Sequence, residues 1–311
     1  MKLTELITKC FAERNGVQRF LSRKVLFRPM EAFGFHVVGD HFYEPIPNIK
    51  EIARSYDETR FRLPSGQSFA FSERADRFED LLGSFASECK NDLDRAGFMM
   101  NPYFRYEDAV TLYCMLRSER IHTVVEVGQG YSTLASLAAL RRNRECGLNT
   151  RFVSIDPFDR LGCQGNANMV QAAEVTLRRT RIQDIPPADL CSQLGEGSLL
   201  FVDSSHVFKP GSDVEFLLRE VFPRVPSGTL IHVHDVYAPY PTPKLRFTKD
   251  KLFFSEQDHL ESFLEFNSAF RIHTPVFWFF RDRCGLRAKL KENHFPDDLP
   301  GNSFYLQRTC C

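Results

Sequence analysis

Short, continuous apolar runs alternate with helical patterns between residues 121 and 235. Such runs have the length and content of strands that are buried on both faces of a sheet. The predicted strands cover residues 123–127, 152–156, 180–183, 198–203 and 228–235. The helices predicted between them cover residues 132–142, 189–194 and 213–222. This alternation predicts βαβ units and a parallel sheet that is covered on both faces.

Further elements extend this pattern to the end of the chain. Residues 257–266 predict a helix, and residues 270–274 and 303–307 predict two more strands. The apolar run at 276–280 is expected to be buried against the sheet or against a partner subunit. The sequence therefore predicts an α/β fold, a doubly wound Rossmann-like sheet of about seven strands, over residues 101–311.

The first 100 residues have a different pattern. A helical opening near residues 3–11 is followed by loops that include Pro45 and Pro47, which favour extended backbone. Apolar residues at helical spacing predict a second helix over residues 72–95 and a third over residues 106–119. We expect residues 1–100 to form an N-terminal helical cap and a substrate-side segment.

The composition argues against several classes of protein. Lys+Arg and Asp+Glu both number 40, so the formal charge is zero, which argues against a nucleic-acid binder. The nine cysteines contain no CxxC pair, which argues against a zinc ribbon and a disulfide framework. The N-terminus lacks a signal-peptide layout, and no apolar run approaches the roughly 20 residues that span a bilayer. We expect a soluble, cytoplasmic protein with no membrane partner.

Polar residues stand at the ends of the predicted strands. These candidates are Glu126, Asp156, Asp203, His234 and Asp235. Because the carboxyl ends of parallel strands meet at one edge of the sheet, where ligands of this fold bind, they predict a common site.

A glycine turn follows the first of these strands. Gly128 and Gly130 allow the backbone to turn sharply and to approach a ligand. A dinucleotide fingerprint needs a third glycine where Thr133 stands, so a cationic sulfonium amino acid fits better than a pyrophosphate. The carboxylate of Asp156 can accept both ribose hydroxyls of an adenosine ligand. Alternatively, the glycines form only a tight turn and Asp156 only caps a helix.

Three motifs resemble a known family. Residues 126–133 resemble the first motif of class I S-adenosylmethionine (SAM)-dependent methyltransferases. Residues 200–207 and 232–240 are similar to a bacterial subgroup related to macrocin O-methyltransferases and cephalosporin-hydroxylase-like proteins. Segments 41–47 and 303–305 resemble the same subgroup, so the resemblance covers about residues 40–308. Gln129 departs from the pattern, because a small residue is common there.

The resemblance implies a set of residues that bind SAM. The methionine moiety would lie against the first strand and the glycine turn, with Ser132 near its carboxylate, Asp156 at the ribose and Asp184 at the adenine amino group. The implied cofactor-binding residues are Glu126, Gly128, Gly130, Ser132, Asp156, Asp184 and Asp203.

The acids and histidines after the fourth and fifth strands are the catalytic candidates. The resemblance implies His206 as the general base, and imidazole suits this role because its pKa lies near neutrality. His234 and Asp235 complete the catalytic set, whereas His232 is expected to be a packed core residue. Asp203, His234 and Asp235 are the candidate metal ligands. The imidazole favours Mn, Fe or Zn over Mg. A metal-free site stays an alternative.

The sequence thus predicts a SAM-dependent methyltransferase that acts on a hydroxyl of a small-molecule acceptor, such as a sugar or natural-product intermediate. Residues 239–243, with Phe42 and Tyr43, would wall the acceptor pocket, and a homodimer is possible. One alternative is a methyltransferase-like binding protein without turnover. Another is a metal-dependent hydroxylase, because two histidines and one carboxylate form the ligand set of non-haem iron oxygenases.

Overall fold

The computed structural model describes residues 21–38, 45–98, 101, 103–158, 160, 175–296 and 300–309. The helix expected near residues 3–11, and Phe42 and Tyr43 of the expected acceptor pocket, lie outside these residues. Among the described residues, no helix combines the length and the apolar character that crossing a membrane requires.

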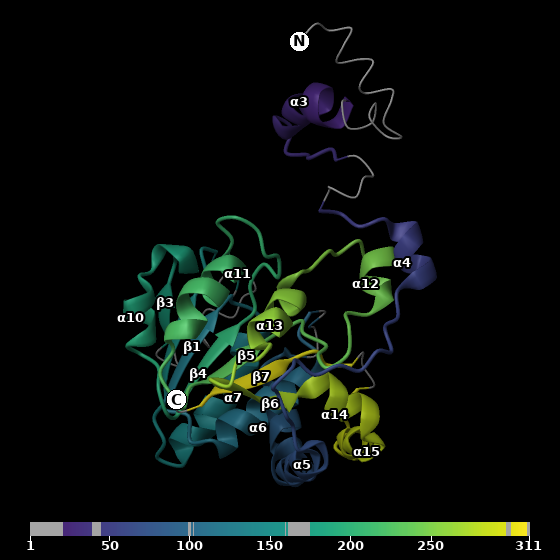
Figure 1. Cartoon of the computed structure of the whole chain (residues 1–311). Coiled ribbons are helices and arrows are strands. Elements are labelled where there is room, and N and C mark those ends of the chain that lie inside the picture. Colours follow the sequence, from purple (N-terminus) through teal and green to yellow (C-terminus); the bar gives the residue numbers. More distant parts are fainter. Residues whose placement is uncertain are drawn as a thin grey trace, which may run out of the picture. The chain divides into compact units, whose positions relative to one another are not determined.

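Seven strands form one sheet in the order β3-β2-β1-β4-β5-β7-β6 (Figure 1). The strands are β1 (Thr123–Val127), β2 (Arg151–Ile155), β3 (Thr176–Arg178), β4 (Ser198–Val202), β5 (Leu230–Val233), β6 (Phe270–Pro275) and β7 (Phe304–Arg308). The first five strands pair in parallel, and β7 runs antiparallel to both β5 and β6. This is the strand order of class I methyltransferases, so the predicted fold class is confirmed.

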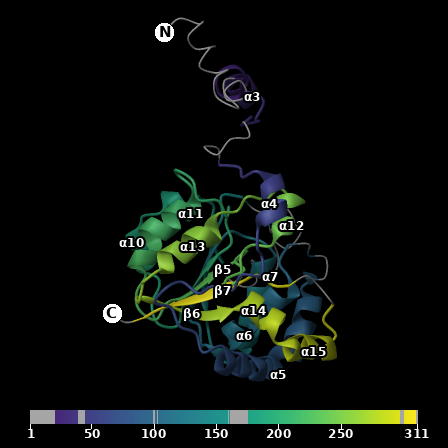
Figure 2. The ribbon, with the colours of Figure 1, turned by 45° about the vertical axis from the view of Figure 1, so that its right-hand side comes forward.

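Helices cover both faces of this sheet, as both views show (Figures 1 and 2). One face carries α5 (Phe71–Arg95), α6 (Tyr106–Ser118), α7 (Tyr131–Glu145), α14 (Val276–Asp282) and α15 (Cys284–Glu292). The other face carries α10 (Pro187–Cys191), α11 (Asp213–Phe216) with the turns η4 (Leu217–Val221) and η5 (Phe222–Arg224), and α13 (Glu256–Leu264). Successive strand residues point to opposite faces, so Val124 belongs to the first core and Val125 to the second.

Two predicted details are wrong. The third strand lies at Thr176–Arg178, whereas residues 182–184 form a 3-10 turn, η3 (Ile182–Asp184). This strand has only three residues and none is fully buried, so it has no apolar run that a pattern could detect. The sheet is also not wholly parallel, because β7 returns between β5 and β6. An apolar run does not indicate the direction of its strand.

The apolar run at residues 276–280 is buried, as expected, and forms the helix α14. Its Phe279 and Phe280 pack on Phe78 of α5, with ring centroids 5.2 and 5.9 Å apart. This helix therefore joins the core of its own chain.

The chain divides into two compact units. The smaller unit comprises Met1–Glu58 and Pro243–Phe253, and the larger comprises Thr59–Thr242 and Phe254–Cys311. The described helices of the smaller unit are η1 (Leu21–Leu26), α3 (Phe27–Glu31), α4 (Ile49–Ser55) and α12 (Lys244–Thr248). The functional division expected at residue 100 stays a prediction.

Candidate functional site

The glycine turn joins the carboxyl ends of β1 and β4. Gly128 has a φ of +92°, and a Cβ atom built there would lie 1.8 Å from the carbonyl oxygen of Asp203. Its N–H donates to the carbonyl of Ile155 at the end of β2 (2.9 Å). Only glycine permits this contact. Gly130 differs, because its backbone is extended and a Cβ atom there would meet nothing within 4 Å.

Glu126 lies beneath this turn and is fully buried. Its carboxylate accepts hydrogen bonds from Ser132 (3.0 Å) and Thr133 (2.7 Å) at the start of α7 and from Ser154 (3.0 Å) of β2. Burial raises the pKa of Glu126 to about 8, although these hydroxyls oppose the shift. Glu126 therefore ties β1, β2 and α7 together. The direct contacts of Glu126 and Ser132 with the methionine moiety stay predictions.

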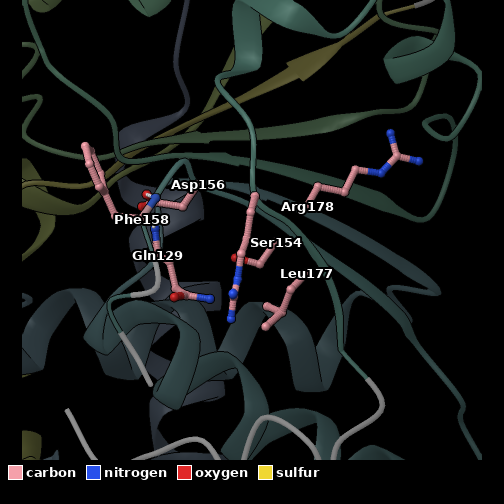
Figure 3. Close-up of a pocket in the computed structure, with 7 residues that line it drawn as sticks. Gln129, Ser154, Asp156, Phe158, Leu177 and Arg178 are labelled. Atoms are coloured by element: carbon pink, nitrogen blue, oxygen red, sulfur yellow. Dashed lines mark hydrogen bonds between the residues drawn. The ribbon is translucent and has the colours of Figure 1, made fainter. Parts of the chain in front are cut away.

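Asp156 follows β2, and its carboxylate bonds two backbone N–H groups beside a hollow. Its two carboxylate oxygens accept the N–H groups of Gln129 (2.9 Å) and Phe158 (2.7 Å). Figure 3 shows these residues together with Ser154, Leu177 and Arg178, which line the same small hollow. Nε of Arg160 lies 3.4 Å from Oδ2 of Asp156. A carboxylate has about four lone-pair positions, so acceptor capacity still remains for a ligand.

Asp184 lies apart from these groups. It is in η3, its side chain is 45% exposed, and it pairs with the guanidinium of Arg181 (2.7 Å). The hydrogen bond from Arg181 lowers the pKa of Asp184. Its contact with adenine stays a prediction.

His206 follows β4 and is held at both ring nitrogens. Its Nε2 atom lies 3.2 Å from Oδ1 of Asp203 and 3.5 Å from Oδ2 of Asp235. Its Nδ1 atom lies 2.9 Å from Oε2 of Glu256, which is in the first turn of α13. The backbone of His206 is left-handed, with a φ of +59°, a conformation that β-carbon-bearing residues adopt rarely and often at functional sites.

His234 follows β5 and faces the same aspartate. Its Nδ1 atom lies 3.3 Å from Oδ1 of Asp203, and its Nε2 atom lies 3.6 Å from Oδ2 of Asp108 in α6. Asp108 is fully buried, and its other oxygen accepts the N–H groups of Asn302 (2.9 Å) and Ser303 (2.8 Å). The segment before β7 therefore fixes Asp108, which faces His234.

The carboxylates set the charges of this cluster. Burial lowers the pKa of His206, but the hydrogen bonds that its ring donates to Asp203 and Glu256 outweigh this effect and raise the pKa to about 10. Burial also opposes the charged form of His234, yet the charge of Asp203 raises its pKa well above the usual value. The two imidazoles in turn hold the pKa of Asp203 below its usual range, against the effect of burial. With a pKa of about 10, His206 carries a proton at neutral pH, and the same carboxylate of Asp203 favours the charged form of His234.

Asp235 stands beside the cluster. Its φ is +57°, and its Oδ1 atom accepts a hydrogen bond from the side-chain amide of Asn302 (2.6 Å). His232 is the expected core residue: it is fully buried, lies between the rings of Phe201 and Tyr305, and bonds Ser303 through Nε2 (2.7 Å).

The structure thus brings together most of the residues predicted at the strand ends. Ligand atoms of Asp203, His206 and His234 all lie within 4.8 Å of one another. The turn at Gly128–Gln129 connects this cluster to Asp156, because it touches Asp203 on one side and donates to Asp156 on the other. The sequence analysis missed Asp108, Glu256 and Asn302, which lie in two helices and in the segment before β7; no local pattern marks them as members of the cluster.

Comparisons with known proteins agree with this fold. Residues 125–236, a little over a third of the chain, match the family model described as "Methyltransferase domain". This segment runs from β1 to just past β5 and includes the glycine turn and both cluster histidines. No curated protein sequence matches the chain.

Several solved structures are similar over most of the chain. An S-adenosylhomocysteine (SAH)-bound methyltransferase of Podospora anserina is 14% identical, with 80% of this chain and 100% of that chain covered and a TM-score of 0.44. A Thermobifida fusca protein assigned as a methyltransferase is 12% identical, with 80% and 96% covered and a TM-score of 0.41. A TDP-rhamnose 3'-O-methyltransferase of calicheamicin biosynthesis is 15% identical, with 78% and 96% covered and a TM-score of 0.38. These likenesses are too distant to identify a substrate.

Proposed function

We propose that the protein is a SAM-dependent methyltransferase that transfers a methyl group to a hydroxyl of a small molecule. One observation carries this proposal. The Gly128 turn and the Asp156 carboxylate lie together at the carboxyl edge of a class I methyltransferase sheet, where Asp156 lines a small hollow. The matched methyltransferase-domain segment contains both residues.

The residues at this edge fit SAM better than a dinucleotide. The remaining lone pairs of Asp156 would accept the ribose hydroxyls, and the apolar side chains of Phe158 and Leu177 would flank the base. A ligand without phosphate needs no third glycine, and Thr133 at that position bonds Glu126 instead. When bound, SAM supplies an activated methyl group on a cationic sulfur.

The His206 cluster is the source of proton chemistry in this proposal. Transfer to oxygen requires alignment of the acceptor with the methyl group and removal of the hydroxyl proton. The sequence predicts His206 as the proton acceptor. Its raised pKa means that it already holds a proton at neutral pH, so it would accept another group's proton only after losing its own. A bound cation that displaced this proton would change the protonation state of His206.

The acceptor class rests on the resemblance of residues 200–207 and 232–240 to the macrocin-related subgroup. We therefore propose a hydroxyl of a sugar or of a natural-product intermediate as the acceptor. Tyr237 and Tyr240, in the segment after β5, are buried and pack on Phe277. They would anchor the loop that walls the acceptor pocket.

The test is methyl transfer itself. The full chain is incubated with isotopically labelled SAM and a panel of sugar and phenolic acceptors, and mass spectrometry follows SAH and the methylated product. The proposal predicts SAH and a labelled product in equal amounts with at least one acceptor. SAM binding without SAH formation across the panel would indicate a binding protein instead. Oxygen uptake with iron and no methyl transfer would indicate a hydroxylase.

A further inference from the structure

The segment that leads into β7, residues 300–303, is bonded to the start of α6; we call this segment the latch. The backbone N–H of Gly301 donates to the carboxylate of Glu107 (2.6 Å), and those of the next two residues donate to Oδ1 of Asp108 (2.9 and 2.8 Å). A Cβ atom at Gly301 would lie 2.8 Å from Cβ of Glu107, so the latch lies directly against the helix.

The latch also holds the segment after β5. The side-chain amide of Asn302 donates to Oδ1 of Asp235 (2.6 Å) and to the hydroxyl of Tyr237 (2.9 Å). The backbone carbonyl of Asn302 accepts the N–H of Val236 (2.7 Å). Release of the latch from α6 would therefore free the chain that leads from β5 to residues 239–243, the expected wall of the acceptor pocket.

A buried carboxyl group lies where the latch meets α6. Glu107 is 5% exposed, and its Oε1 atom lies 2.9 Å from Nε of Arg287 in α15. Burial has the largest effect and raises the pKa of Glu107 to about 7, and the charge of Asp108 acts in the same direction. The N–H of Gly301 and the guanidinium of Arg287 oppose this shift. Within the described part of the chain these are the charged groups that act on Glu107, because the latch has no charged side chain.

Opening of the latch would expose the Glu107 carboxyl group to water, where its pKa is 4.5. The closed latch thus retains a proton that the open latch releases between pH 4.5 and pH 7. Because the form that binds more protons is favoured at low pH, acid favours the closed latch, and opening becomes easier as the pH rises toward 7. Above pH 7 both forms are ionised, so the dependence on pH ends.

We infer that residues 300–303 form a proton-dependent latch, which protonated Glu107 keeps closed and which ionised Glu107 allows to open, so that Asn302 releases the segment after β5. The latch would make the mobility of the acceptor side of the fold depend on pH. This inference goes beyond the proposed function and requires neither bound SAM nor methyl transfer.

The experiment is hydrogen exchange of the backbone N–H groups in the full chain without SAM, followed by NMR between pH 5 and pH 9. Each measured rate is compared with the intrinsic rate at the same pH, so that only the opening reaction is compared. We expect the protection of Gly301, Asn302 and Ser303 to fall by about 40-fold between pH 5 and pH 7 and to stay constant above pH 8, because opening releases one proton. The N–H groups of β1 should be at least about 10-fold better protected, because they exchange only when the sheet opens.

Matched variants identify the group that titrates. Glu107→Gln keeps the size and an acceptor oxygen of the side chain but cannot ionise, so the protection of the three latch N–H groups should vary by less than about threefold over the same range. Glu119→Gln, at the other end of α6, removes a carboxylate that pairs with Arg77 (3.4 Å) and should leave the wild-type profile unchanged. Arg287→Gln removes the cation that favours ionised Glu107, so the fall in protection should extend to higher pH.

Three results would overturn the inference. One is constant protection of the latch N–H groups in the wild-type protein between pH 5 and pH 7, a comparison that needs no variant. Another is protection equal to that of β1, because the latch would then not open separately. The third is an undiminished fall in a Glu107→Gln protein whose circular dichroism matches that of the wild type. Because SAM is absent from every arm, these outcomes are independent of the methyl-transfer assay.

Discussion

The two halves of the carboxyl edge are built on different principles. Over β1 and β2, the site consists mainly of glycines, hydroxyls and backbone amides around the carboxylate of Asp156, and the charge of Glu126 is suppressed by burial. Over β4 and β5, it consists of imidazoles and carboxylates that hold one another in their charged forms. The first half depends on backbone shape, and the second depends on side-chain charge. Substitutions in the two halves should therefore produce different kinds of loss.

The largest expected effect belongs to the charged half. His206→Gln removes the imidazole that the sequence predicts as the general base, so methyl transfer should fall by at least about 100-fold. The dissociation constant for SAM should stay within about twofold, because this residue is not part of the glycine turn or the hollow. Turnover assays and calorimetry on the same preparation measure both, with His122→Gln as the control. Equal losses of turnover and of SAM affinity would contradict the functional separation of the two halves.

The next largest effect is a difference in stability between two glycine-to-alanine variants. Gly128→Ala places a Cβ atom against the carbonyl of Asp203 and forces a left-handed backbone on alanine, which should cost about 3 kcal/mol or more in the free energy of unfolding. The Cβ atom of Gly130→Ala would have no heavy atom within 4 Å, so this variant should lose less than about 1 kcal/mol in the free energy of unfolding. Urea denaturation of the two variants measures the difference. Similar losses would contradict the close approach of β1 to β4.

SAM binding should weaken when Asp156 loses its charge but keeps the size of its side chain. Asp156→Asn keeps the size of the side chain but replaces one acceptor oxygen by a donor group. We expect SAM to bind about 10-fold more weakly or worse, as for loss of charge-assisted hydrogen bonds. Asp189→Asn on the exposed part of α10 is the matched control and should change nothing. Unaltered SAM affinity in Asp156→Asn would remove Asp156 from the ribose site.

The last expected effect is a change in the slope of stability with pH, which is small over any one pH unit. The pKa of Glu126 is about 8 in the folded protein and 4.5 in the unfolded chain, so the folded state holds one more proton between these values. Stability from this group is complete below pH 4.5 and is lost as pH rises through 8, by about 1.4 kcal/mol per pH unit. Glu126→Gln should lack this slope in urea unfolding curves between pH 5 and pH 8. An unchanged slope would mean that Glu126 is ionised when folded.

Much of this architecture could be predicted from the sequence, because the strands β1, β2, β4 and β5 are continuous apolar runs with polar residues at their ends. That pattern predicted the sheet, its class and the convergence of Asp203, His206 and His234. The short β3 and the direction of β7 have no such signal. Asp108, Glu256 and Asn302 could not be predicted, because helices α6 and α13 and the segment before β7 bring them to the cluster through tertiary packing alone.

The most direct test of the account is a calorimetric titration of SAM into the wild-type protein, with SAH and NAD⁺ as competitors. The account predicts one SAM per chain, full displacement by SAH and no displacement by NAD⁺, because Asp156 offers acceptors for ribose and Thr133 stands where a pyrophosphate-binding turn needs its third glycine. Absence of SAM binding, or displacement of SAM by NAD⁺, would contradict it.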